Sequence, residues 1–230
     1  MSCVLIIAAH PDDEVLGAGG TIYKRTRAGD QVVCLALGDG ISSRYSSPDE
    51  PPQKAIMERR KHAEKAGDLL GIDQFHFRNF PDNRFDSVDL LDLVKEIETV
   101  AGQVQPDVVY THHHSDLNID HRRTNQAVMT AFRPEPDSTV QEIYSFEVLS
   151  STEWTPPATP GSFEPNVFVD IEEAWSKKLE AMRCYSGEYR EFPHPRSEEA
   201  MEALAKRRGS QAGHQFVEAF VLERSVQNGF

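Results

Sequence analysis

The chain has few cysteines and no long hydrophobic run. Among its 230 residues are three cysteines, Cys3, Cys34 and Cys184, and they form no Cys-x-x-Cys pair. This spacing excludes a disulfide scaffold and predicts unpaired thiols in a reducing compartment. The apolar runs are shorter than the roughly 20 residues that a membrane span needs, and the N-terminus lacks the basic region of a signal peptide. We therefore expect a cytoplasmic protein without membrane insertion.

Basic residues are outnumbered by acidic ones. The chain has 24 Lys and Arg against 37 Asp and Glu, a net charge of −13. Such a charge repels polyanions, which argues against nonspecific nucleic-acid binding and against a membrane-bound glycolipid as substrate. An apolar fraction of 39% with 27% charged residues is typical of a soluble globular protein with a sizeable core.

The hydrophobic pattern predicts strands that alternate with helices. Short apolar runs predict strands at residues 4–8, 31–37, 74–77, 107–110, 143–148 and 167–171. Helical periodicity with Gly or Pro stops predicts helices at residues 19–28, 53–70, 88–104, 120–132, 175–185 and 197–208. This alternation predicts an α/β fold, Rossmann-like, with a mostly parallel sheet and helices on both faces. In the common doubly wound order the first and fourth strands are neighbours, which places a site at their carboxyl ends.

The domain organisation is expected to be simple. The Pro-rich segment 155–165 is the one candidate linker, and the residues after it are too few for an independent core. We expect a single domain over residues 1–230. Residues from about 150 to 230 form a C-terminal extension that either completes the active site or makes an oligomer contact. The Ser- and Pro-rich loop at residues 42–52 is long enough to cover a site.

Two clusters of polar residues follow the first and fourth strands. Residues 9–14 read AHPDDE and residues 112–121 read HHHSDLNIDH. A solvated polar turn would explain a lone Asp pair, but imidazoles and carboxylates together at strand ends suit a divalent metal of the zinc type. The sequence therefore predicts one metal site built from both clusters, with a position left open for water.

The chain resembles the PIG-L/LmbE-like family of zinc-dependent N-deacetylases. The family motif (A/P)HPDDE stands at residues 9–14, and the family's Arg-initiated helix matches the segment from Arg59 to Leu70-Gly71. The second motif, HxDH, is matched in its last two positions by Asp120 and His121. The likeness covers residues 4 to about 132 well and the C-terminal hundred residues loosely.

The resemblance implies a site and a reaction. His10, Asp13 and His121 become the ligands of one Zn²⁺ per chain, although such a site also accepts Fe²⁺ and other divalent ions. Asp12 becomes the general base, and Arg59 contacts the substrate. The implied reaction removes the N-acetyl group from N-acetylglucosamine-type amino sugars or their conjugates and releases acetate. The implied partner is this small molecule, and family members often assemble as homo-oligomers.

The sequence departs from the family at Asn118, where the first His of HxDH is expected. That His helps to stabilise the oxyanion, so another donor is needed. Asn118 itself, His114 and His194 are the candidates, and His194 is held between two prolines. We expect His194 to act in catalysis with Asp120 orienting it, and Asn118 to contact the substrate.

Several alternatives remain open at this point. The chain could hydrolyse another N-acyl amide, of the antibiotic or thiol-conjugate type, or it could be a catalytically silent metal- or sugar-binding module. Retention of Asp12 argues against the silent module. His112 and His113 are expected to be loop or supporting residues rather than ligands. The glycines at 17, 19 and 20 form no dinucleotide-binding motif, and packing explains them.

Overall fold

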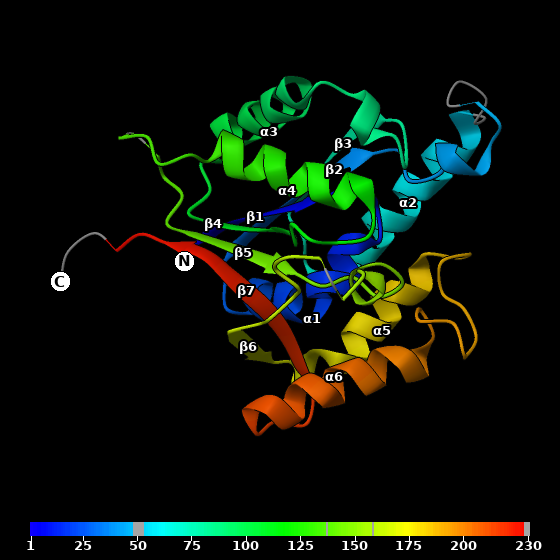
Figure 1. Ribbon diagram of the computed structural model, residues 1–230. Helices are drawn as coiled ribbons and strands as arrows, with labels where there is room; N and C mark the ends of the chain where they lie inside the picture. Colours follow the sequence, from blue (N-terminus) through cyan, green and yellow to red (C-terminus); the bar gives the residue numbers. More distant parts are fainter. Residues whose placement is uncertain (48–52, 137, 158, 228–230) are drawn as a thin grey trace.

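The computed structural model describes residues 1–47, 53–136, 138–157 and 159–227, and the last part of the predicted loop 42–52 lies outside these ranges. Within the described residues the chain forms a sheet of seven strands in the order β3-β2-β1-β4-β5-β7-β6 (Figure 1). The strands are β1 (Cys3–Ala8), β2 (Gln31–Gly38), β3 (Gln74–Phe80), β4 (Val108–His112), β5 (Glu142–Phe146), β6 (Val167–Asp170) and β7 (Val217–Ser225).

Five of these strands run parallel. β1 pairs with β2 on one side and with β4 on the other, so that Ile6 lies opposite both Cys34 and Tyr110. β3 and β5 extend the parallel part of the sheet outward. The predicted fold class is confirmed, and so is the adjacency of the first and fourth strands, which brings the two polar clusters together.

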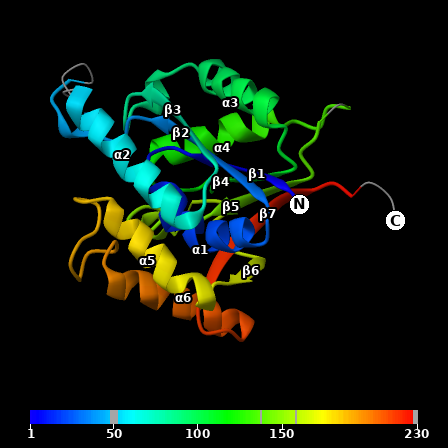
Figure 2. The ribbon, with the colours of Figure 1, turned by 180° about the vertical axis from the view of Figure 1, so that it is seen from behind.

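Helices cover both faces of the sheet. They are α1 (Asp13–Arg27), α2 (Gln53–Leu70), α3 (Leu90–Val104), α4 (Ile119–Ala131), α5 (Trp175–Cys184) and α6 (Glu198–Ala212). α3 and α4 lie on one face, whereas α1, α2, α5 and α6 lie on the other, and α2 runs beside α5 when the molecule is seen from behind (Figures 1 and 2).

Alternate residues of β1 enter two separate cores. Ile6 packs in the cluster that contains residues of α1, α2 and α5, while Ile7 packs in the cluster that contains residues of α3 and α4. Both side chains are at most 1% exposed. A strand buried on both faces must be apolar at every position, which is why its sequence reads as a continuous apolar run.

The largest difference from the predicted elements is β7. This strand was not predicted, and it pairs antiparallel with both β5 and β6. Helix α1 also begins at Asp13, six residues earlier than predicted. The helix opens with two carboxylates, and Gly17, Gly19 and Gly20 have low helix propensity, so the hydrophobic periodicity did not reveal where the helix starts.

Close packing accounts for the glycines of α1. A Cβ atom at Gly17 would lie 2.3 Å from the Phe146 ring, and one at Gly20 would lie 2.8 Å from Ile171. Beside Gly20, the Glu218 carboxylate accepts hydrogen bonds from the backbone N–H groups of Gly20 and Thr21, at 2.8 and 2.7 Å. Glycine therefore lets α1, which carries Asp13 at its N-terminus, lie directly against the neighbouring elements.

Two further expectations concern the thiols and the membrane. Cys3, Cys34 and Cys184 are unpaired, as predicted. Across the described ranges, no helix combines the length and the apolar composition that crossing a bilayer requires.

Candidate active site

A polar cavity of about 150 Å³ lies at the carboxyl ends of β1 and β4. Five of the residues singled out in the sequence line it: His10, Asp12, Arg59, Asn118 and His121. Ser150, Ser151, Glu188 and Arg196 complete its wall from the C-terminal part of the chain. Residues separated by more than 180 positions in the sequence therefore face one cavity.

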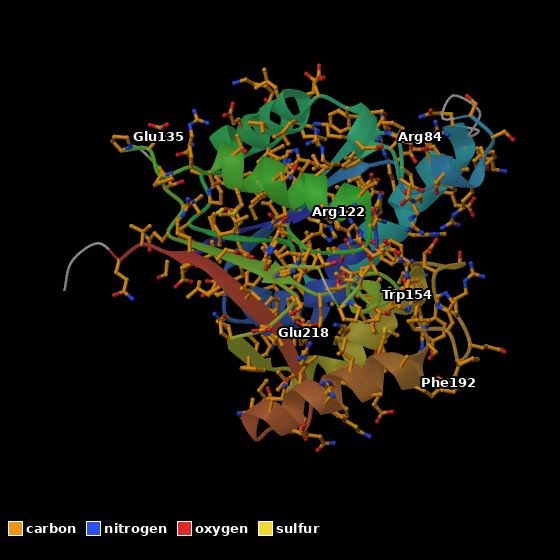
Figure 3. All side chains as sticks on the ribbon, viewed as in Figure 1. Arg84, Arg122, Glu135, Trp154, Phe192 and Glu218 are labelled. Carbon is orange, nitrogen blue, oxygen red and sulfur yellow. The ribbon has the colours of Figure 1, made fainter. Side chains whose placement is uncertain are left out.

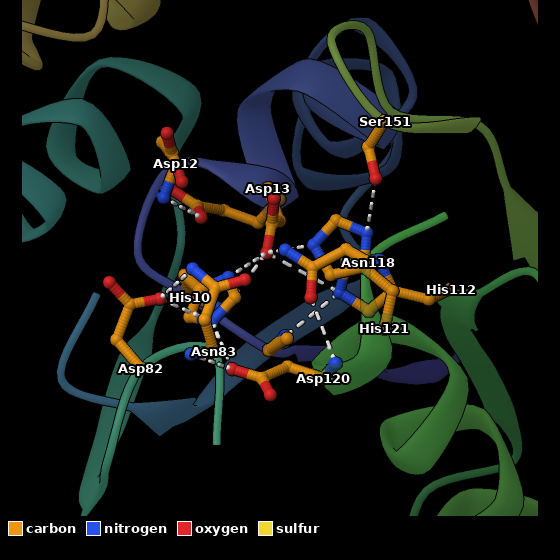
Figure 4. Close-up of polar contacts among 12 residues, drawn as sticks. His10, Asp12, Asp13, Asp82, Asn83, His112, Asn118, Asp120, His121 and Ser151 are labelled. Atoms are coloured by element: carbon orange, nitrogen blue, oxygen red, sulfur yellow. Dashed lines mark hydrogen bonds and ion pairs between the residues drawn. The ribbon is translucent and has the colours of Figure 1, made fainter. Parts of the chain in front are cut away.

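His10, Asp13 and His121 converge on one point. Oδ2 of Asp13 lies 3.4 Å from Nδ1 of His10 and 3.4 Å from Nε2 of His121. The donor atoms of the three side chains lie within 4.8 Å of one another (Figure 4). All three residues are buried, so they offer a fixed set of two nitrogens and one carboxylate.

Each of the two imidazoles is held from behind by a buried carboxylate. Nε2 of His10 lies 2.8 Å from Oδ2 of Asp120 (Figure 4), and Nδ1 of His121 lies 3.2 Å from Oδ2 of Asp116. Metal-ligating histidines commonly have such a carboxylate on their second nitrogen, because it fixes the ring and raises its basicity. The ring nitrogens that face Asp13 are thereby oriented toward a common point.

The carboxylates around this point stabilise positive charge. Burial disfavours the protonated form of His121, but Asp13 and Asp116 outweigh burial and raise its pKa to about 9. Burial likewise opposes protonation of His10, yet Asp120, Asp13 and Asp82 raise its pKa well above the usual value. A divalent cation would meet the same favourable field.

The residues present fit a bound metal ion. Oδ1 of Asp13 is buried and has no hydrogen-bond partner among the described residues. An unsatisfied buried carboxylate oxygen is costly unless a further group binds it. Together with two oriented imidazoles, it forms the donor set that zinc-type ions prefer, and a second group of donors, His10, Asp82 and Asp120, shares His10 with it.

His112 supports this set rather than joining it. Its Nε2 accepts a hydrogen bond of 2.8 Å from the backbone N–H of Ala9. Its ring stacks on the His121 ring, with centroids 3.9 Å apart. Burial, helped by the nearby His121, lowers the pKa of His112 well below its usual value, so the ring is neutral. His112 thus packs against the back of His121 as an uncharged wall.

Asp12 points away from this donor set. Its Oδ2 lies 2.8 Å from Nη1 of Arg196 and 3.1 Å from Nη2 of Arg59. Burial raises the pKa of Asp12 above its usual value, although both guanidinium groups oppose that shift. The side chain is 2% exposed, yet it borders the cavity. The adjacent carboxylates therefore have different surroundings: Asp13 lies among imidazoles, and Asp12 lies beside guanidinium groups.

The backbone at Asp12 is strained. Its φ angle is 128°, a region that residues other than glycine rarely adopt. Glu14 helps to hold this conformation, since its Oε2 accepts the Asp12 N–H at 2.9 Å while its Oε1 accepts the Tyr185 hydroxyl. Burial raises the pKa of Glu14 to about 7. This turn places Asp12 immediately before the first residue of α1, Asp13, while the two carboxylates contact different groups.

Glu188 joins three arginines in the wall of the cavity. It accepts a hydrogen bond of 2.6 Å from Nη1 of Arg59 and one of 2.7 Å from Nη1 of Arg196, and it also contacts Arg44. The predicted substrate residue Arg59 is thus fixed on both sides, between Asp12 and Glu188. Arg196 is fixed further by a 2.8 Å hydrogen bond from its Nε to Ser150.

Asn118 lies in the cavity, while the other two candidates for the missing histidine do not line it. Oδ1 of Asn118 accepts the Asp120 N–H at 2.8 Å and caps α4 (Figure 4). His194 accepts the backbone N–H of Arg196 at its Nδ1, 3.0 Å away. His114 groups instead with His113 and Glu223.

Asp120 has a different partner from the one expected. It contacts His10, and it accepts the backbone N–H groups of Asn83 and Phe85 at 2.6 and 2.9 Å. Each contact comes from the loop after β3 or the end of β1. The structure thus brings Asp120 to a predicted metal ligand and does not bring it to His194.

The sequence did not single out Asp116, Glu188 and Arg196. Asp116 stands within the second polar cluster, and its spacing from His121 was the available signal. Its oxygens are held by Ser151 and by Thr152, the latter at 2.5 Å, from the segment after β5. Glu188 and Arg196 lie in an irregular segment with no motif, so only the folded chain reveals them.

Comparison with known proteins identifies the family of the chain. The model of the PIG-L family, described as GlcNAc-PI de-N-acetylase, matches residues 5–132. The chain belongs to the PIG-L family. The matched region holds the residues of both polar clusters, and it ends before the segment that supplies Glu188 and Arg196.

Two curated relatives of this PIG-L protein are deacetylases by name. An uncharacterized deacetylase of Escherichia coli K12, YaiS, is 30% identical over 186 residues, which is 78% of this chain and 88% of the relative. The diacetylchitobiose deacetylase of Thermococcus kodakarensis is 27% identical over 230 residues, covering 94% of this chain and 80% of the relative. The likeness extends beyond the motifs into the C-terminal part of the chain.

The PIG-L fold also occurs in an enzyme of another class. The crystal structure of the 4-carboxy-2-hydroxymuconate hydratase of Pseudomonas putida KT2440 matches with a TM-score of 0.75 at 23% identity, covering 100% of both chains. A likeness at this identity establishes the fold alone. The reaction has to be argued from the site.

Proposed function

We propose that this PIG-L protein is a metal-dependent N-deacetylase, which releases acetate from an N-acetylated amino sugar or a conjugate of one. The observation that carries the proposal is the convergence of His10 and His121 on Asp13 beside the separately held Asp12. The family description and the diacetylchitobiose deacetylase support an N-acetylated sugar as the substrate class.

The proposed metal ligands are His10, Asp13 and His121, which would hold one Zn²⁺ or similar divalent ion at this site. Two neutral imidazoles and one carboxylate leave such an ion a net positive charge. When bound, the ion would lower the pKa of a coordinated water and stabilise negative charge on the substrate carbonyl oxygen.

Asp12 is the proposed general base. Its burial and raised pKa suit a carboxylate that accepts a proton from water and returns it to the departing amine. The strained turn keeps Asp12 beside the ligand set but not part of it. Arg59 and Arg196 fix its position, so little reorganisation is needed as charge moves.

Arg196 is the proposed substitute for the charge of the missing motif histidine. Its Nε and Nη1 are engaged by Ser150, Asp12 and Glu188. Within the described part of the chain, its Nη2 makes no recorded hydrogen bond, which leaves a guanidinium N–H for an oxygen atom of the substrate. The Asn118 amide, which also lines the cavity, supplies a neutral donor.

The shape and polarity of the cavity support a small hydrophilic substrate. Ser43, Asp82 and Asn83 extend its polar wall beyond His10. Hydroxyl and carboxylate groups of this kind form hydrogen bonds with sugar hydroxyls, and an apolar acyl chain would find few contacts. This favours an amino sugar over a long N-acyl amide.

We also propose that the chain works as one domain, since Ser150, Glu188 and Arg196 belong to the C-terminal region and line the cavity. A cytoplasmic location and self-association remain predictions. Trp154 and Phe192 are 52% and 65% exposed and lie at the molecular surface (Figure 3), which supports self-association. Light scattering during size-exclusion chromatography measures the oligomeric state.

Acetate release tests the proposed function. The zinc-reconstituted chain is incubated with N-acetylglucosamine, diacetylchitobiose, an N-acetylglucosaminyl conjugate and a non-sugar N-acetyl amide, beside an Asp12→Asn variant of verified metal content. We expect release from a sugar substrate by the wild type and none by the variant. Preference for the non-sugar amide would overturn the substrate class, and equal activity of the variant would overturn the role of Asp12.

A further inference from the structure

The three-histidine run at the end of β4 divides between two places. His112 packs behind His121 at the cavity. His113 and His114 lie instead with Glu223 of β7, and the donor atoms of these three residues lie within 4.8 Å of one another. None of the three lines the catalytic cavity. We infer that His113, His114 and Glu223 form a second site for a divalent metal ion of the zinc type.

His113 is held in a position suitable for binding a metal. Its side chain is almost fully buried, and its ring packs edge-on against Phe163 with the centroids 5.2 Å apart. Its Nδ1 lies 2.9 Å from the Ser115 hydroxyl. Among the described residues, its Nε2 makes no recorded hydrogen bond. A histidine held at one nitrogen and free at the other is the usual arrangement of a metal ligand.

Glu223 is fixed in a similar way. Its Oε1 accepts a 2.7 Å hydrogen bond from the Ser145 hydroxyl of β5. No hydrogen bond of Oε2 is recorded within the described ranges, so one carboxylate oxygen remains for a ligand. β5 pairs with both β4 and β7, so the sheet itself sets the separation between Glu223 and the two histidines.

A glycine leaves space beside the third donor. A Cβ atom at Gly161 would lie only 2.5 Å from Nε2 of His114. Gly161 has a φ angle of +74°, which favours glycine, and it belongs to the Pro-rich segment that follows β5. The backbone therefore approaches the His114 ring at a position where any residue with a Cβ would crowd Nε2.

The donor types indicate the class of metal. Two imidazoles and one carboxylate match the ligands of Zn²⁺, with a solvent molecule in the fourth position. Harder ions such as Mg²⁺ and Ca²⁺ prefer oxygen ligands, so they fit this group poorly. A metal here would join the end of β4 to β7. Its role is structural, and it is independent of the proposed catalytic metal.

Zinc stoichiometry tests the site in the full chain. Metal-free protein is dialysed against buffered free Zn²⁺ over a concentration series, and bound zinc is measured by mass spectrometry. We expect close to two ions per wild-type chain and close to one for His114→Ala and for Glu223→Gln. His214→Ala is the control, because His214 lies outside the metal clusters and is exposed; it should bind as the wild type does.

A catalytic-site variant separates this inference from the proposed function. In a His121→Ala background we expect one zinc ion per chain, and adding His114→Ala should remove it. Cobalt substitution gives a second readout, since tetrahedral Co²⁺ produces visible absorption that the double variant should lack. If His114→Ala and Glu223→Gln bind as much zinc as the wild type at every concentration, the three residues form only a hydrogen-bonded cluster and the inference fails.

Discussion

Oδ2 of Asp120 lies 2.8 Å from Nε2 of His10, although 110 residues separate the two side chains. The contact joins the end of β1 to the first turn of α4. It gives one of the proposed metal ligands a buried carboxylate partner, and Asp116 does the same for His121. Asp120 and Asp116 therefore orient the two imidazoles of the proposed ligand set.

This arrangement predicts the effect of Asp120→Asn. The amide keeps the size of the side chain but removes the charge that holds His10, so metal affinity should fall by roughly 10- to 100-fold. Competition with a fluorescent zinc chelator, carried out with His114→Ala as the parent, measures the loss. Asp92→Asn, at an exposed position on α3, should leave the affinity unchanged. An unchanged affinity in Asp120→Asn would contradict the proposed role.

Arg196→Lys tests the proposed cationic donor. Lysine keeps the charge but cannot contact Asp12, Glu188 and Ser150 together, and it has no spare guanidinium N–H. We expect kcat to fall by about 10²- to 10³-fold, the usual effect of losing an oxyanion donor, with zinc content unchanged. Steady-state kinetics on the preferred sugar substrate separate kcat from KM.

His194→Ala provides the matched comparison on the same segment. Its ring does not line the cavity, so kcat should stay within about twofold of the wild type. The opposite pattern, an inactive His194→Ala and an active Arg196→Lys, would restore His194 as the donor that the sequence predicts.

Metal removal should change stability as well as activity. A chelator should abolish acetate release, and zinc should restore it. Because the ligands converge only in the folded chain, zinc at about 100 times its Kd should stabilise the fold by about 2.7 kcal/mol per site. Thermal unfolding with and without zinc measures the effect. Asp12→Asn should keep the zinc-dependent rise in Tm while losing activity; a variant without that rise would place Asp12 among the ligands.

The buried ion pair between Lys178 and Glu218 should be important for stability. Nζ of Lys178 lies 2.6 Å from Oε1 of Glu218 and donates to the carbonyl of Leu16 at 2.8 Å. Lys178→Met leaves the carboxylate buried without its partner, which should cost about 3–5 kcal/mol. Urea denaturation measures this change in the free energy of unfolding.

An exposed pair and a double variant complete that experiment. Lys95 and Glu98 lie 2.7 Å apart on the surface of α3, and Lys95→Met should cost less than about 1 kcal/mol. Replacing Lys178 and Glu218 together, by Met and Gln, should recover part of the loss, because no buried charge is left unpaired. Equal losses of stability in Lys178→Met and Lys95→Met would contradict the importance of the buried pair.

The sequence by itself predicted the parallel part of the sheet and the chemistry of the proposed ligands. Strands such as β1 are buried on both faces, so their apolar runs are continuous and local. His10, Asp12 and Asp13 follow β1 directly, and His121 follows β4 closely. Neighbouring parallel strands end at the same edge of the sheet, so the convergence of these four residues followed from the strand order alone.

Only the tertiary structure decided which side chains surround those ligands. β7 pairs antiparallel through hydrogen bonds with strands that lie far away in the sequence, and its own residues carry no signal of that partner. Glu188 and Arg196 reach Asp12 from an irregular segment, and Asp120 takes His10 rather than His194. Such contacts depend on how the chain packs across long separations, whereas a motif records only neighbours along the sequence.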